Sequence, residues 1–217
     1  MKARFVTFEG IEGSGKTVVS KEACRALEAA GVRTVLLREP GGTAVSEEIR
    51  RILLDPARTE MAARAELLLY LASRAQLVAE AIRPALAEGR SVVCDRYLDA
   101  SVAYQGWARG LGEKLVEELN AIAVDGAVPD RTYLLDCPVA EGLGRGPLHR
   151  EQEGISARDR LEREDARFHE KVREGYLRIA RRETERVVVI DASRPLHEVL
   201  TAVFEDLERL FAVRLQR

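Results

Sequence analysis

A glycine-rich segment that ends in Lys-Thr lies near the start of this 217-residue chain, as Gly10-Ile11-Glu12-Gly13-Ser14-Gly15-Lys16-Thr17. Its spacing is typical of a phosphate-binding loop, in which glycines let successive backbone N–H groups point at phosphate oxygens. We expect Lys16 to reach the β- and γ-phosphates of a nucleotide and the Thr17 hydroxyl to bind Mg²⁺. A turn that binds nothing is the alternative, but a strand-like run, 4–9, precedes the segment and a helical pattern, 16–30, follows it.

A second motif, Arg38-Glu39-Pro40-Gly41-Gly42-Thr43, follows the next strand-like run. Pro-Gly-Gly indicates a turn, and Thr43 is a suitable cap for the helix after it. A turn and a cap need no charge, so Arg38 and Glu39 favour a functional role at the end of the strand.

A third motif, Asp95-Arg96-Tyr97, ends the apolar run at 91–95. An Asp in this position beside a phosphate loop commonly holds a Mg²⁺-bound water, and the planar guanidinium of Arg96 suits a phosphate. A structural ion pair between Asp95 and Arg96 is the alternative, and it would lie at the same edge.

Strand-like and helical patterns alternate along the chain, which predicts a parallel sheet with helices on both faces. In such a sheet ligands bind at the carboxyl ends of the strands, where all three motifs lie. We expect Pro84 to kink or break the long helical segment 60–88. The predicted strands are 4–9, 33–37, 91–95, 131–136 and 186–191, and the predicted helices are 16–30, 44–54, 60–88, 112–125, 160–183 and 195–212.

Composition narrows the class of protein. The formal net charge of −2 gives no general attraction to nucleic acid, and no run approaches the ~20 apolar residues of a membrane span. The N-terminus lacks the apolar region of a signal peptide, so we expect a cytoplasmic protein. Cys94 and Cys137 lie in apolar runs and are interpreted as inert buried thiols; Cys24 and the three histidines are assigned no role.

The three motifs together resemble the thymidylate kinases, which phosphorylate dTMP with ATP. The resemblance rests on Phe8–Thr17, on 38–43 and on 95–106, whose order and spacing match, and it covers nearly the whole chain. It is to the bacterial type, since Glu12 stands where some relatives carry an arginine. It implies one domain, 1–217, with the fold of the P-loop nucleoside monophosphate kinases and a mobile lid at about 138–162.

The resemblance also implies contacts with the acceptor nucleotide. Tyr70, where relatives usually have Phe, would stack on thymine, and Arg74, on the same helix face, would help to hold the base. From the residues alone, Tyr70 in its apolar run is interpreted as a core residue. Glu12 and Glu39 would lie near the sugar 3′-hydroxyl and the metal. The remaining implied dTMP contacts are Arg38, Arg96, Ser101, Tyr104 and Gln105.

On the donor side, the resemblance implies that ATP contacts the loop 10–17, a lid arginine and Arg194 in the loop that flanks the adenine. Lys16, Arg96, Glu12 and one lid arginine would form the catalytic set. Arg150 is favoured as that arginine, then Arg145; the alternative is a solvated loop in which arginines pair with nearby Glu. Thr17 and Asp95 would hold Mg²⁺, and a homodimer is implied. Another nucleotide kinase and a P-loop ATPase switch are the competing functions.

Overall fold

Five parallel strands form one sheet in the order β2-β3-β1-β4-β5. The computed structural model describes residues 2–152 and 159–215, and for 146–152 the backbone only. Each observed strand lies within one residue of its predicted bounds. The strands are β1 Phe5–Glu9, β2 Thr34–Arg38, β3 Ser91–Asp95, β4 Arg131–Asp136 and β5 Val187–Asp191.

The register of the sheet brings the three sequence motifs to one edge. Arg38 at the end of β2 is paired with Asp95 at the end of β3, and Asp95 is paired with Phe8 of β1, one residue before the end of that strand. Because all strands are parallel, their carboxyl ends lie side by side. The segments 10–17, 38–43 and 95–106 are therefore neighbours, as the sequence predicted.

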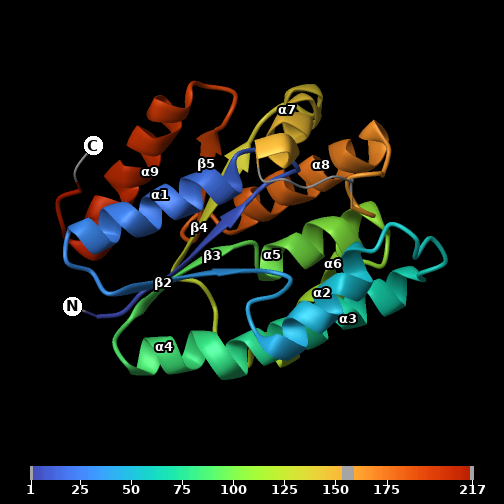
Figure 1. Ribbon diagram of the computed structural model, residues 1–217, viewed down its shortest axis with the longest axis horizontal. Helices are drawn as coiled ribbons and strands as arrows, with labels where there is room; N and C mark the ends of the chain where they lie inside the picture. The colour runs from blue at the N-terminus through green and yellow to red at the C-terminus, as the bar shows by residue number, and fades with distance from the viewer. Residues whose placement is uncertain (1, 153–158, 216–217) are drawn as a thin grey trace.

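Helices cover both faces of the sheet (Figure 1). α1 and α9 pack together on one side of the strands, and α5, α6 and α8 lie on the other. The helices are α1 Lys16–Ala29, α2 Ala44–Leu54, α3 Ala63–Leu77, α4 Arg83–Ala87, α5 Leu98–Ser101, α6 Glu113–Val124, α7 Val139–Gln152, α8 Ala166–Arg182 and α9 Leu196–Phe211, with π-helical segments at Val78–Ile82 and Val102–Ala108.

Local signals account for several helix ends. The Thr43 side chain accepts a hydrogen bond from Ser46 N and caps α2, as predicted. Asp165 caps α8 in the same way, so this helix starts later than the predicted residue 160. Pro84 does not end the helical path; α3 passes through the π-helical segment Val78–Ile82 and α4 then carries Pro84 in its first turn.

Two segments that the sequence left as connections are helical. Residues 98–108 form α5 and the π-helical segment after it, which packs against α8. The first part of the predicted lid forms α7, despite Gly142 and Gly144. The three cysteines are buried free thiols, in agreement with the interpretation of Cys94 and Cys137. None of the described helices is long and apolar enough to cross a membrane.

Candidate active site

The phosphate loop curls between β1 and α1 with three glycines at positive φ: Gly10 at 145°, Gly13 at 71° and Gly15 at 91°. L-residues with side chains rarely adopt these angles, so glycine is required for the path of the loop. Lys16 Nζ folds back over the loop and donates to Ile11 O at 2.6 Å and to Ser14 Oγ at 3.3 Å. Burial, with the nearby Arg96 cation, lowers the pKa of Lys16 to about 8.

Thr17 and Asp95 meet at the ends of α1 and β3. Thr17 Oγ1 donates to Asp95 Oδ2 at 2.6 Å, so two hard oxygen ligands stand together beside the loop. The described part of the chain has no cluster of three His, Cys, Asp or Glu side chains that could hold a metal ion. This donor set fits a Mg²⁺ ion that takes its other ligands from phosphates and water.

Arg96 extends from the end of β3 across the phosphate loop. Its Nη2 lies 2.6 Å from Glu12 Oε1, and its Nη1 donates to Gly10 O and to the Tyr176 hydroxyl. The Tyr104 hydroxyl donates to Glu12 as well. Burial alone would raise the pKa of Glu12, but the Arg96 and Lys16 cations hold it at about 2. This group thus places a guanidinium, an ammonium and a carboxylate around the loop.

Glu9, which sequence reasoning missed as a site residue, lies beneath this group as a fully buried carboxyl at the end of β1. Its Oε1 accepts from Tyr97 N and its Oε2 from the Tyr176 hydroxyl, both at 2.7 Å. Burial, followed by the Asp99 charge, raises the pKa of Glu9 to about 8. Glu9 therefore joins β1, the segment after β3 and α8 behind Arg96. A Glu that closes an apolar strand was the only signal for it.

Arg74 is buried, with 1% of its surface exposed. All five guanidinium N–H groups have protein partners: Nε and Nη2 donate to Glu39 Oε2, Nη2 also to Tyr97 O, and Nη1 to Ser101 and Asn120. The sequence did not predict this structural role. A contact between Arg74 and a base remains a prediction, and it requires the exchange of one of these bonds.

Two other predicted acceptor contacts are engaged within the protein. Arg38 pairs with Glu47 at 2.9 Å and donates to Pro40 O. Tyr70 is 9% exposed and belongs to the main core cluster, in line with the alternative that it is a core residue. Burial, followed by the Glu66 and Asp159 charges, raises the pKa of its hydroxyl, and the nearby Arg96 cation lowers it.

The start of α7 packs directly on the phosphate loop. A Cβ on Gly13 would lie 1.9 Å from Gly142 O, and a Cβ on Gly142 would lie 2.5 Å from Glu12 O. Both positions therefore require glycine. Sequence reasoning assigned no role to Gly142, since this contact joins segments far apart in the chain.

A family model described as "Thymidylate kinase" matches residues 8–203. The chain belongs to the thymidylate kinase family. It is 50% identical to a thymidylate kinase of Desulfosudis oleivorans, with 95% of this chain and 97% of that protein covered, and 48% identical to one of Geobacter sulfurreducens, with 94% and 95% covered. The crystal structure of thymidylate kinase from Ehrlichia chaffeensis superimposes with a TM-score of 0.76 at 31% identity, covering 96% of this chain and 99% of that one.

Family membership makes the chain an enzyme, a nucleoside monophosphate kinase with the P-loop fold. Two of the predicted donor-side arginines can be located. Arg145 on α7 donates to Ala192 O at 2.8 Å and pairs with Glu141, which ties α7 to the loop after β5. Arg194 in that loop is exposed and pairs with Asp191 and Glu198. The Arg150 side chain lies outside the described residues.

Proposed function

We propose that the enzyme transfers the γ-phosphoryl group of ATP to the 5′-phosphate of dTMP, giving ADP and dTDP on the route to dTTP. The arrangement of Lys16, Arg96 and Glu12 around one phosphate loop carries the proposal. Two cations there can offset the repulsion between a triphosphate and a phosphate monoester, which is the main obstacle to this reaction.

On the donor side, the loop 10–17 binds the ATP phosphates through backbone N–H groups and Lys16. Thr17 and Asp95 would hold a Mg²⁺ ion, which would supply charge neutralisation for the phosphates. Arg145 on α7 and Arg194 in the loop after β5 are the further residues proposed to contact ATP.

On the acceptor side, dTMP binds between 38–43, the α3 face with Tyr70 and Arg74, and the segment 96–105. A phosphate monoester dianion is already a nucleophile near neutral pH, so the reaction needs no general base. Arg96 and Lys16 orient the two phosphates in line and stabilise the transferred group. A lid arginine completes this set, with Arg150 ahead of Arg145.

The acceptor profile tests the proposal. ADP release should be fast with ATP and dTMP, slow with AMP, dCMP or thymidine, and abolished in Lys16→Ala. ADP release that is indifferent to any acceptor would instead favour a P-loop ATPase switch. Equal rates with several nucleoside monophosphates would favour a broader nucleotide kinase.

We further propose that the chain is one domain, 1–217, that acts as a homodimer in the cytoplasm. α3 carries Leu68, which is 58% exposed and lies in the segment 62–82, whose apolar richness permits an interface. A Leu68→Glu variant should lower the mass measured by sedimentation if this face pairs with a second copy. An unchanged mass would exclude this face.

A further inference from the structure

Glu66 on α3 is a buried carboxylate that accepts hydrogen bonds and forms ion pairs with residues of two other segments. Its side chain is 1% exposed. Gln105 Nε2 donates to Glu66 Oε1 at 2.7 Å, Arg109 reaches both carboxylate oxygens, and Arg160 Nη1 lies 2.6 Å from Oε2. None of the functions assigned above uses Glu66.

Two arginines fix the charge and the position of this carboxylate. Burial alone would raise the pKa of Glu66, but the hydrogen bond from Gln105 and the Arg109 and Arg160 cations lower it. Arg160 is itself anchored, since its Nε donates to Leu53 O and its backbone N to Leu54 O at the end of α2. Glu66 is therefore an ionised, immobile acceptor.

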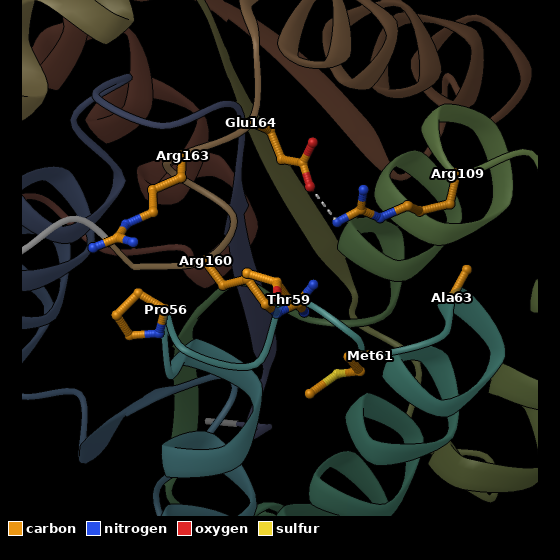
Figure 2. A pocket seen from close by; sticks show the side chains of 8 residues that line it. All are labelled: Pro56, Thr59, Met61, Ala63, Arg109, Arg160, Arg163 and Glu164. Atoms are coloured by element: carbon orange, nitrogen blue, oxygen red, sulfur yellow. Dashed lines mark ion pairs between the residues drawn. The ribbon is translucent and has the colours of Figure 1, made fainter.

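Arg109 and Arg160 line a cavity of about 320 Å³ between the α2–α3 connection and residues 160–164 (Figure 2). Arg109 extends from one side and meets Glu164, at 2.7 Å. Arg160 lies near the centre of the view. Arg109 thus has two carboxylate partners, Glu164 at the cavity and Glu66 in the interior, and only Glu66 touches Gln105.

An ionised carboxylate cannot donate a hydrogen bond, so Gln105 has to turn its NH₂ group toward Glu66. Its carbonyl Oε1 is then fixed on the opposite side of the amide. No hydrogen bond to this oxygen forms within the described residues. The Gln105 side chain is itself buried, with 1% of its surface exposed, so the surrounding residues prevent its amide from rotating freely.

The base region proposed above lies close to this amide. Glu66 is one helical turn before Tyr70 on the same face of α3, and its charge, after burial, raises the pKa of the Tyr70 hydroxyl. Gln105 directly follows Tyr104, whose hydroxyl contacts Glu12. Thymine offers an N3–H donor between two carbonyls, whereas cytosine has an acceptor at N3 and an amine at C4.

We propose that Glu66 is a positioning residue that sets base selectivity by holding Gln105 Oε1 toward the N3–H of thymine. The inference rests on the proposed function, in which Gln105 lines the base. An amide carbonyl attracts the N3–H of thymine and repels the N3 lone pair of cytosine, so one fixed orientation accepts the first base and rejects the second.

A Glu66→Gln variant tests the proposal. With the two arginines holding its carbonyl, the introduced amide would turn its NH₂ toward Gln105, whose own amide would reverse and present a donor to the base. We expect kcat/KM to fall about 10-fold or more for dTMP and to rise for dCMP, so that the ratio of the two falls about 100-fold. A purely structural role would lower both values together.

Glu164→Gln is the matched control, because it removes a carboxylate partner of Arg109 without touching Gln105; its ratio should equal that of the wild type. Glu66→Asp keeps the negative charge but shortens the side chain by one methylene group. It should raise the KM for dTMP while dCMP stays rejected, and this variant tests the proposal if Glu66→Gln does not fold. An unchanged ratio in folded Glu66→Gln, or an unchanged KM in Glu66→Asp, overturns the proposal.

A Gln105→Ala variant distinguishes a failure of the role proposed for Glu66 from a failure of the proposed dTMP site. If its KM for dTMP equals that of the wild type, Gln105 does not contact the base and the assignment of the acceptor site is wrong. If Gln105→Ala weakens dTMP binding but folded Glu66→Gln keeps the wild-type ratio, the acceptor site stands and the role of Glu66 is wrong.

Discussion

Arg96 Nη2 lies 2.6 Å from Glu12 Oε1, and this ion pair joins the end of β3 to the phosphate loop. The backbone of Arg96 has φ of 68°, in the left-handed region that residues with a side chain rarely adopt. Its guanidinium is also 5.2 Å from the centre of the Tyr104 ring. The cation is thus held over the loop by the protein itself, and a contact with a phosphate would exchange one anionic partner for another.

Arg96→Ala should lower kcat about 10²- to 10³-fold, because a preorganised cation at the transferred group is lost. Steady-state ADP release with saturating ATP and dTMP measures this. Arg25→Ala, which removes an exposed arginine paired with Glu22 on α1, is the control and should keep wild-type turnover. Near-normal activity of a folded Arg96→Ala enzyme would remove Arg96 from the catalytic set.

Gly142→Ala should raise the KM for ATP about tenfold or more, since the new methyl group would lie 2.5 Å from Glu12 O and displace the phosphate loop. Gly144→Ala is the matched control, because a Cβ there meets no atom within 4 Å. It lies on the same helix and should leave KM unchanged. Equal KM values in the two variants would mean that α7 does not position the loop.

Glu9→Gln should change how stability depends on pH. The pKa of Glu9 is about 8 in the folded protein and near 4.5 when unfolded, so the folded state binds the proton more tightly and loses stability as pH rises from about 4.5 to 8. The amide cannot ionise and avoids this loss. The melting temperature of the variant should therefore rise relative to wild type between pH 5 and pH 8. A constant difference across that range would exclude a protonated Glu9.

Arg74→Leu should destabilise the fold by about 3–5 kcal/mol, because it leaves the Glu39 carboxylate buried without its cation. Arg38→Leu removes an arginine from a half-exposed pair with Glu47 and should cost about 1 kcal/mol or less. Urea unfolding of both variants measures the two values. Similar small losses would show that the buried pair contributes little to stability.

Residues close together in sequence determined much of this protein. The strand before Gly10, the glycines of the loop, Lys16 and Thr17 form one local unit, and alternating patterns are enough to predict a parallel sheet whose edge collects the motifs. Thr43 capped its helix as expected, because a cap needs only atoms three residues away. Such features depend on backbone sterics and short-range hydrogen bonds, which residues close together in the sequence determine.

Tertiary structure decided which of these groups are free and which are occupied. Arg74 meets Glu39 and Asn120 across 35 and 46 residues, and Gly13 meets Gly142 across a still longer separation. Burial of Glu9 likewise depends on Tyr176, 167 residues away. Hydrophobic periodicity indicates the secondary structure of a segment and which of its faces is buried. The charge state and the partners of a buried polar group depend instead on which other segments pack against it. Only the folded chain brings those partners together.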